Sequence, residues 1–314
     1  MTATAPATID YSRDLLTGTE WNSSTVRDLL ALAADVKSRP SKFARALAGR
    51  YIAMIFEKPS LRTRTTFDVG MQSLGGGAVY LDHQHTRLGE RETIKDVAKN
   101  LERWVHGIVA RTFAQSSIDE LAEHASIPVI NALSDLYHPC QAYTDFFTLE
   151  ERFGSSRGLI LAYVGDGNNV CHSLLLAAAR VGAHVRVGTP ANYEPNAEVV
   201  SEARLLARET DAKIEVFHSA EEAVAGAQAI YTDTWASMGQ ESEAAERAKI
   251  FAAFQVNDAL MSIAAPDAVF MHCLPAHRGQ EVTSAVIDSP RSIVYDQAEN
   301  RLHVQKAILL MLLS

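Results

Sequence analysis

Short apolar runs alternate with helix-like patterns along most of the 314 residues of this chain. The apolar runs predict buried strands, and apolar residues at helical spacing predict helices between them. The predicted strands cover residues 51–57, 78–81, 107–112, 128–133, 159–164, 184–187, 213–217, 229–232, 268–274 and 292–295. The helical patterns include residues 93–105, 118–124 and 173–181. This alternation is typical of parallel sheets covered by helices on both faces, so the predicted fold class is α/β.

The predicted strands are too many for one ordinary sheet, and the chain is long enough for two domains. The best boundary is a helical pattern over residues 141–153, which ends at a Gly-Ser-Ser sequence. We therefore predict two doubly wound parallel-sheet domains, residues 1–150 and 151–297, joined by interdomain helices. On its pattern alone, a last helix within residues 298–314 can pack on either domain.

The overall composition disfavours several classes of protein. Acidic residues outnumber basic ones by 38 to 29, and the formal charge of −9 argues against general nucleic-acid binding. No apolar run approaches the ~20 residues of a membrane helix, so no membrane contact is predicted. The 3 cysteines have no CxxC spacing, and the N-terminus lacks the features of a secretory signal. We expect a cytoplasmic protein without disulfides or zinc.

The segment Ser60-Leu61-Arg62-Thr63-Arg64 stands between a predicted strand and a helical pattern over residues 65–74. At such a turn, free backbone N–H groups and the positive end of the helix dipole attract anions, and guanidinium groups match phosphate oxygens. The alternative is a capped helix with solvated arginines. The density of arginines and hydroxyls in so short a segment favours a phosphate site.

The longer segment of residues 56–67 resembles the carbamoyl-phosphate loop of the transcarbamoylase family, whose usual form is Ser-Thr-Arg-Thr-Arg. Here Leu61 replaces the first Thr, a change that should be tolerated if this position contributes mainly its backbone N–H. The resemblance implies that Ser60, Leu61, Arg62 and Thr63 bind carbamoyl phosphate. It does not identify the amine that is carbamoylated.

Two further motifs carry polar groups to strand and helix ends. Arg111 ends a predicted strand, where an arginine can form a surface ion pair. Beside the phosphate loop it can instead polarise a carbonyl or hold an anion such as carbamoyl phosphate. His138 and Pro139 open the helical pattern of residues 141–153, and His138 could simply cap that helix. In the family pattern His-Pro-x-Gln, the resemblance implies that His138 bonds the carbonyl oxygen of carbamoyl phosphate and that Gln141 holds the carbamoyl NH₂.

The sequence Gly-Asp-Gly-Asn-Asn at residues 165–169 partly matches a dinucleotide-binding loop. The match is weak because Val170 replaces the third glycine, and the next predicted strand ends without the acidic residue that would bind a ribose. A nicotinamide-dependent oxidoreductase is therefore disfavoured. The family resemblance instead implies that Asn169 donates to an amino-acid carboxylate.

Asp233 and the sequence Ser237-Met238-Gly239 follow a predicted strand. A carboxylate at this edge of a parallel sheet can bind an α-ammonium group, although Asp233 alone could be a helix N-cap. The Ser-Met-Gly sequence resembles the ornithine loop of the ornithine-specific transcarbamoylases, and aspartate transcarbamoylases lack it at this place. The resemblance implies that Asp233, Ser237 and Met238 bind ornithine together with Asn169.

The sequence His272-Cys273-Leu274-Pro275 ends another predicted strand. A lone buried cysteine is usually inert packing. The resemblance implies that Cys273 lies near carbamoyl phosphate and the reacting amine without forming a thioester, and that the Leu274 carbonyl binds the carbamoyl NH₂. It also implies that Arg301 completes the carbamoyl-phosphate site.

Residues 86–90 match a family loop that reaches the site of a neighbouring subunit. Many ornithine enzymes carry Gln or His where this chain has Arg87, and aspartate enzymes place a lysine in the same loop. We expect Arg87 to contact the phosphate across the subunit boundary, with Arg91 and a solvated arginine as the alternatives. The resemblance thus implies a homotrimer, and it implies that the last helix crosses back to the first domain.

The motifs follow the family's order from about Trp21 to the end of the chain. The resemblance implies direct carbamoyl transfer from carbamoyl phosphate to the δ-amine of L-ornithine, giving L-citrulline and phosphate without metal or cofactor. A transcarbamoylase for putrescine or an N-acylated ornithine is the alternative within the family. A non-catalytic ligand-binding paralogue is another, although it would be expected to lack catalytic arginines or the histidine. The residues expected to act in catalysis are Arg62, Arg111, His138, Asp233, Cys273 and Arg301.

Overall fold

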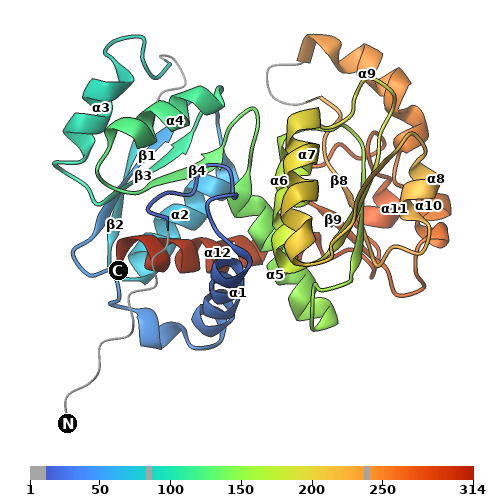
Figure 1. Ribbon diagram of the computed structural model, residues 1–314, viewed down its shortest axis with the longest axis horizontal. Coiled ribbons are helices and arrows are strands. Elements are labelled where there is room, and N and C mark those ends of the chain that lie inside the picture. The colour runs from blue at the N-terminus through green and yellow to red at the C-terminus, as the bar shows by residue number, and fades with distance from the viewer. Residues whose placement is uncertain (1–11, 83–86, 237–240) are drawn as a thin grey trace.

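The computed structural model describes residues 12–82, 87–236 and 241–314. They form two lobes, each built around a parallel sheet (Figure 1). The first sheet has the strand order β2-β1-β3-β4 and consists of β1 (Tyr51–Phe56), β2 (Gly77–Asp82), β3 (Gly107–Arg111) and β4 (Val129–Leu133). The second has the order β7-β6-β5-β8-β9 and consists of β5 (Ile160–Val164), β6 (His184–Gly188), β7 (Ile214–Phe217), β8 (Ala229–Thr232) and β9 (Val269–His272).

Helices connect these strands and cover both faces of the sheets (Figure 1). The α-helices are α1 (Ser23–Ser38), α2 (Leu61–Ser73), α3 (Ile94–Leu101), α4 (Gln115–His124), α5 (Pro139–Phe153), α6 (Asn169–Val181), α7 (Ala197–Leu206), α8 (Ala220–Val224), α9 (Ala244–Ile250), α10 (Asp258–Ile263), α11 (Ser284–Ile287) and α12 (Val294–Leu313). The short 3₁₀ helices are η1 (Pro40–Phe43), η2 (Ala207–Glu209), η3 (Glu241–Glu243) and η4 (Phe251–Phe254).

The predicted α/β class is confirmed, and so is every predicted strand except the last. Residues 292–295 are not a strand: Ser292 makes only an isolated bridge to Phe270, and α12 already begins at Val294. Buried residues recur at helical spacing through Val294, Gln297 and Arg301, so the apolar run ends in the N-cap and the first residues of a helix. Similarly, α2 begins at Leu61 rather than at residue 65.

The two faces of the first sheet are packed by different helices. Ile52, Met54 and Phe56 of β1 lie in the core cluster that contains α1, α2 and α12. Ala53 and Ile55 lie in a second cluster with α3 and α4. This alternation follows from the period of two in a strand, and it explains why β1 is apolar along its whole length.

The second sheet repeats this arrangement. Leu161 and Tyr163 of β5 pack in the cluster that contains α6 and α7. Ala162 and Val164 pack with α8, α10 and α11 on the opposite face. Both faces are therefore buried, which leaves the ends of the strands as the places where polar chemistry can occur.

Helices α5 and α12 connect the two lobes through one continuous core. Helix α12 packs against α1, α2 and α5, and α5 packs against α6 of the second lobe (Figure 1). Residues of both sheets, such as Met54 and Tyr163, belong to the same apolar cluster. The predicted division into two domains at residue 150 stays a prediction.

The order of each sheet reverses at one point, between β1 and β3 in the first and between β5 and β8 in the second. In open parallel sheets, ligands bind outside the carboxyl ends of the strands at such reversals. The segments that follow these four strands carry most of the predicted site residues. The fold thus places those segments at one edge of each sheet.

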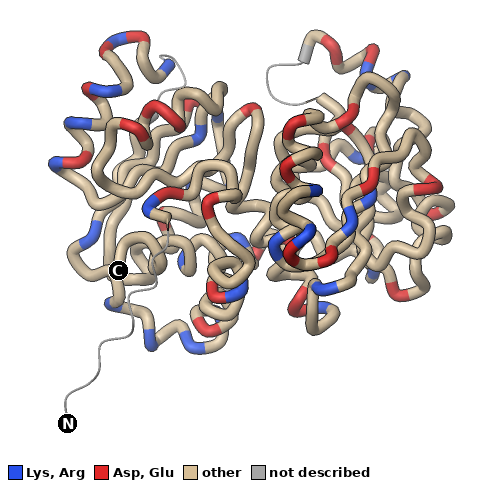
Figure 2. The backbone as a smooth tube through the Cα atoms, in the orientation of Figure 1, with Lys and Arg blue, Asp and Glu red and all other residues tan. Residues whose placement is uncertain are grey.

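Charged residues of both signs are interspersed along both lobes (Figure 2). Within the described ranges, no helix is both long enough and apolar enough to cross a membrane. A local group of arginines without acidic neighbours would therefore differ from the rest of the described chain.

Among the glycines that the structure describes, Gly167 in the loop after β5 is the one with the closest backbone neighbour. A Cβ at this position would lie 2.2 Å from the Pro195 nitrogen and 2.4 Å from the Glu194 carbonyl carbon. We expect Gly167→Ala to lower the free energy of unfolding by about 2 kcal/mol or more, because the loop after β5 or the backbone of residues 194–195 must move to admit the methyl group. Chemical denaturation measures this. The control is Gly70→Ala in α2, whose Cβ would meet nothing closer than 3.4 Å; equal losses in both variants would contradict the argument.

Candidate active site

Ser60 determines where α2 begins. Its backbone is extended, and its Oγ accepts a hydrogen bond from the Thr63 N–H (3.3 Å). Ser60, Leu61, Arg62 and Thr63 line one cavity. The side chain of Leu61 is 78% exposed, so a contribution of this residue through its backbone fits the geometry. A helix N-terminus with an arginine beside it is suited to an anion.

The two arginines of this turn lie in different surroundings. Arg62 lines the cavity. The guanidinium of Arg64 instead lies 3.7 Å from the centre of the Tyr80 ring, and Arg64 is not among the residues around the cavity. Residues separated by one position on a helix face different sides, which accounts for the difference. Only Arg62 of this pair is placed to contact a molecule in the cavity.

Arg111 at the end of β3, His138 before α5 and Arg301 in α12 bring buried polar groups to the same cavity. The Nε atoms of Arg111 and Arg301 and the Nδ1 atom of His138 have no hydrogen-bond partner in the described structure. We call Arg62, Arg111 and Arg301 the arginine cluster. Among the described residues, none of the three forms an ion pair with a carboxylate. Buried donors without acceptors are rare, so this cluster is suited to an anionic ligand.

Burial and mutual repulsion disfavour the protonated forms of these groups. Burial, followed by the charges of Arg301 and Arg62, lowers the pKa of Arg111 to about 9. Burial, followed by the charges of Arg301 and Arg111, holds the pKa of His138 well below its ordinary value. At neutral pH Arg111 therefore remains charged, and His138 is a neutral imidazole with one N–H to donate. Such a combination can stabilise negative charge that develops on a carbonyl oxygen.

Two hydrogen bonds fix Arg301. Its Nη2 donates to Thr63 Oγ1 (2.6 Å), and its Nη1 donates to Gln141 Oε1. One guanidinium thus connects α12 with α2 and α5. Gln141 itself does not line the cavity, so its predicted contact with the carbamoyl NH₂ stays a prediction.

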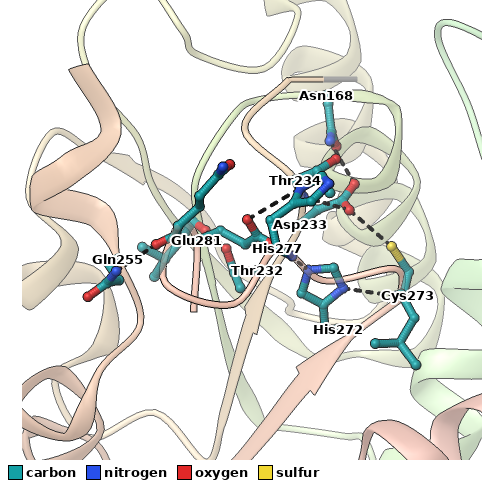
Figure 3. Close-up of polar contacts among 12 residues, drawn as sticks. Asn168, Thr232, Asp233, Thr234, Gln255, His272, Cys273, His277 and Glu281 are labelled. Carbon is teal, nitrogen blue, oxygen red and sulfur yellow. Dashed lines mark hydrogen bonds and ion pairs between the residues drawn. The ribbon is translucent and has the colours of Figure 1, made fainter. Parts of the chain in front are cut away.

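Asp233 follows β8 and forms the acidic part of the cavity wall. Its Oδ1 accepts from the Thr234 N–H (2.8 Å) and from the Cys273 thiol (3.1 Å), and its Oδ2 accepts from Asn168 Nδ2 (2.8 Å). Figure 3 shows Asp233 between Asn168 and Cys273. Because all its described partners are neutral donors, the carboxylate has no cation of its own and is suited to an ammonium group.

The segment after β9 is held by a buried histidine. The Leu274 N–H donates to His272 Nδ1 (2.8 Å), and His272 Nε2 lies 3.2 Å from Glu281 Oε1, with both side chains fully buried (Figure 3). Leu274 has a φ of +60°, a left-handed conformation that costs energy in a residue with a side chain. The His272 contact stabilises this conformation at the cavity wall.

The two asparagines of the loop after β5 divide their contacts between the lobes. Asn169 Nδ2 donates to the Ser134 carbonyl (2.6 Å) and the residue lines the cavity. Asn168 caps α6 through its Oδ1, while its Nδ2 holds Asp233. The sequence does not predict the contact of Asn168 with Asp233. Asparagine is a common N-cap residue, so its presence at the start of a helix needs no further explanation.

The cavity has a volume of about 480 Å³. The predicted site residues that line it are Ser60, Leu61, Arg62, Thr63, Arg111, His138, Asn169, Asp233, Cys273, Leu274 and Arg301. Ser237 and Met238 lie outside the described residues. Lys58, Thr234 and His277 also line the cavity and are not predicted. Lys58 and Thr234 stand just after β1 and β8, so their position at strand ends is the signal that could have identified them.

Arg87 lies apart from this cavity in the single chain. Its side chain is exposed, and its guanidinium lies 4.8 Å from the centre of the Phe113 ring. The buried carboxylate of Glu57 accepts from the Leu88 and Phe113 N–H groups, both at 2.7 Å, and so ties this loop to the segment after β3. The contact of Arg87 with a neighbouring site stays a prediction.

Asp233, His272 and Cys273 each have a potential metal ligand atom, and these atoms lie within 4.8 Å of one another. Each of them already has a partner: both nitrogens of His272 are engaged, and the Cys273 thiol donates to Asp233. We therefore describe the group as a hydrogen-bonded unit. The prediction that no metal takes part stays a prediction.

Fold and cavity define an α/β enzyme with a site for a small, multiply charged anion next to a carboxylate suited to an amine. Two family models match the chain. Residues 13–151 match the carbamoyl-P binding domain of aspartate/ornithine carbamoyltransferase, and residues 157–312 match its Asp/Orn binding domain.

Individual relatives agree with the family models. The anabolic ornithine carbamoyltransferase of Pyrococcus furiosus is 50% identical over 96% of this chain and 96% of its own. A solved structure of ornithine carbamoyltransferase from Pyrococcus furiosus has a TM-score of 0.93, with 96% of this chain and 97% of that chain covered. A solved N-acetyl-L-ornithine transcarbamylase mutant is 32% identical, with a TM-score of 0.86 and coverage of 95% and 99%. The chain belongs to the aspartate/ornithine carbamoyltransferase family.

Burial, followed by the charge of Asp233, raises the pKa of the Cys273 thiol well above its ordinary value. We expect iodoacetamide to alkylate Cys273 at least about tenfold more slowly at pH 8 than an unperturbed thiol, because little thiolate is present. Asp233→Asn removes the neighbouring negative charge, lowers the thiol pKa and should speed the reaction. Peptide mass spectrometry follows the rate. Asp288→Asn, which changes an exposed carboxylate elsewhere, is the control, and an unchanged rate in Asp233→Asn would contradict the electrostatic cause.

Proposed function

We propose that this chain transfers the carbamoyl group of carbamoyl phosphate to the δ-amine of L-ornithine, forming L-citrulline and phosphate. The observation that carries the proposal is the arginine cluster, which has no carboxylate partner among the described residues and shares one cavity with Asp233. A dianion satisfies the arginines, and an amino acid with an ammonium group satisfies Asp233. Family membership and the names of the relatives support both substrates.

The phosphate binds at the N-terminus of α2, where Ser60 to Thr63 offer backbone N–H groups and hydroxyls and Arg62 offers its charge. Arg301 completes this part of the site with Cys273 and Leu274 nearby, and Gln141 holds the carbamoyl end. Arg111, His138 and the Thr63 hydroxyl stabilise the negative charge that develops on the carbonyl oxygen during attack. The new N–C bond forms, the C–O bond to phosphate breaks, and the proton that the attacking amine gives up leaves with the phosphate.

The amino acid binds on the opposite side of the cavity. Asp233 holds the α-ammonium group and Asn169 donates to the α-carboxylate, with Ser237 and Met238 as further ligands. This grip aims the δ-amine at the carbonyl carbon, which is catalysis by positioning. The amine must lose its proton to attack, and its free pKa resembles that of lysine, ~10.4. Burial beside the arginine cluster lowers this value.

The assembly, the domain division and the cellular role of the enzyme are also proposals. We propose a homotrimer in which Arg87 reaches the phosphate site of the adjacent copy, two domains divided near residue 150, and a cytoplasmic role in arginine biosynthesis. Light scattering measures the assembly directly, with the mass of three 34.3 kDa chains as the expected result. A monomeric mass combined with full activity would contradict the shared site.

The experiment that tests the function is a carbamoylation assay with L-ornithine, putrescine, L-lysine, N-acetyl-L-ornithine and L-aspartate. We expect strong preference for L-ornithine. Preference for N-acetyl-L-ornithine or putrescine would retain the carbamoyl transfer and overturn the ornithine assignment. Turnover of none of the amines, despite binding of carbamoyl phosphate, would contradict the enzymatic proposal.

Arg62→Ala tests the phosphate contact. We expect calorimetric affinity for carbamoyl phosphate to fall at least about a hundredfold, because a charge-assisted contact in a partly dry site is lost. Arg64→Ala removes a neighbouring arginine that packs on Tyr80 instead of lining the cavity, and it should bind normally. Near-normal binding by Arg62→Ala would refute its role.

Asp233→Asn tests the ammonium contact. The variant keeps the size of the side chain but loses its charge, so the KM for L-ornithine should rise by about tenfold or more while the KM for carbamoyl phosphate changes little. Steady-state kinetics with each substrate varied in turn separates the two. Unchanged ornithine saturation and turnover would show that Asp233 has another role.

A further inference from the structure

A chain of buried side-chain hydrogen bonds runs behind the cavity and connects its two sides. At one end, Arg301 donates to Thr63 Oγ1 and to Gln141 Oε1. Gln141 Nε2 in turn donates to Asp145 Oδ1 at 2.7 Å. These four residues lie on three helices: Thr63 on α2, Gln141 and Asp145 on α5, and Arg301 on α12. The chain therefore crosses the junction between the lobes.

The same carboxylate oxygen continues the chain toward the second lobe. Gln297 Nε2 of α12 also donates to Asp145 Oδ1, at 2.6 Å. Gln297 Oε1 accepts from the backbone N–H of His272 at the end of β9 (3.0 Å). The next residue, Cys273, donates to Asp233. Asp145 therefore lies midway between the arginine cluster and the strand end that contacts Asp233.

Asp145 and the donors at the opposite ends of the two amides together determine the direction of Gln141 and Gln297. Its side chain is fully buried, and Gln141 and Gln297 are each 1% exposed, so water does not compete for these contacts. An amide has a donating and an accepting end, whereas Asp145 Oδ1 accepts whether or not the carboxyl group is protonated. Both glutamines must turn their NH₂ groups toward Oδ1. Their carbonyl oxygens then face Arg301 on one side and the His272 N–H on the other.

Burial raises the pKa of Asp145 to about 7, although Gln141 and then Gln297 lower it by hydrogen bonding. Burying a carboxyl group costs free energy, and an apolar residue at this position would avoid that cost. The cost is offset only if the hydrogen bonds that Asp145 accepts serve a purpose. Neither Asp145 nor Gln297 lines the cavity. Any effect on substrates must therefore pass through Arg301 on one side and β9 on the other.

We infer that Asp145 is a positioning residue that aligns both halves of the site, holding Arg301 through Gln141 and the end of β9 through Gln297. This inference rests on the proposed function. Loss of the acceptor removes one of the two contacts that hold the Gln141 amide and leaves its buried NH₂ group without an acceptor, so Gln141 fixes Arg301 less firmly. The loss reaches carbamoyl phosphate through Arg301 and the amine through the segment that contains Cys273.

The test compares Asp145→Ala with Asp145→Asn and with Thr148→Ala in the full-length protein. Thr148 is buried on the next turn of α5 and also contacts α12, where its Oγ1 accepts from Asn300 Nδ2 (3.0 Å), but it does not join the chain. We expect Asp145→Ala to raise the KM for carbamoyl phosphate by about tenfold and to lower kcat. Asp145→Asn keeps an acceptor oxygen and should stay within about threefold of the unmodified protein.

Thr148→Ala should lose thermal stability to a similar extent but keep its kinetic constants within about twofold. Equal kinetic losses in Asp145→Ala and Thr148→Ala would reduce Asp145 to a structural residue and overturn the inference. So would an Asp145→Asn variant as impaired as Asp145→Ala, because the acceptor and not the charge is held to matter.

Gln297→Leu provides an independent test if Asp145→Ala does not fold. It removes the contacts of Gln297 with Asp145, the His272 N–H and the Tyr231 hydroxyl (3.2 Å), while Asp145 still holds Gln141. The KM for L-ornithine should rise by about fivefold, with the KM for carbamoyl phosphate within about twofold. Equal changes for both substrates, or no change, would overturn the inference. If the unmodified protein does not carbamoylate ornithine, the proposed function is refuted. The inference about Asp145 is tested only when the unmodified protein is active, because each variant is compared with it.

Discussion

The structure depends on one electrostatic constraint, the arginine cluster. Guanidinium groups reach one cavity from α2, β3 and α12, and the described residues give none of them a carboxylate partner. Like charges in a partly dry site repel one another, and burying them without partners is unfavourable. The apolar core that runs through α5 and α12 and includes residues of both sheets supplies the stability that offsets this repulsion.

Negative charge is present near the cluster but is kept from neutralising it. Asp233 is held by the neutral donors Asn168, Thr234 and Cys273. Asp145 contacts Arg301 only through Gln141. Arg301 is therefore oriented by hydrogen bonds to neutral groups, so its charge remains available to a substrate. The same separation leaves the Asp233 carboxylate available to an ammonium group on the other side of the cavity.

Sequence periodicity predicts nearly all strands because β1 and β5 are apolar on both faces, as buried parallel strands must be. It fails at residues 292–295, where the apolar residues Ile293, Val294 and Tyr295 lie at the N-cap and the start of α12. Motifs at strand ends identify most of the cavity wall. The family resemblance separates Arg62 from Arg64, and the structure places their side chains in different surroundings. The motifs do not reveal Asp145, because contacts between distant helices decide its role and no local pattern encodes them.

The most direct test of the account is the thermal midpoint of the protein as inorganic phosphate is added, compared with chloride at the same ionic strength. If the arginine cluster binds multiply charged anions, the thermal midpoint should rise with phosphate concentration, by roughly 5 °C at a hundred times the dissociation constant. Chloride should have little effect. Equal midpoints in the two salts at all concentrations would mean that the arginine cluster is not an anion site.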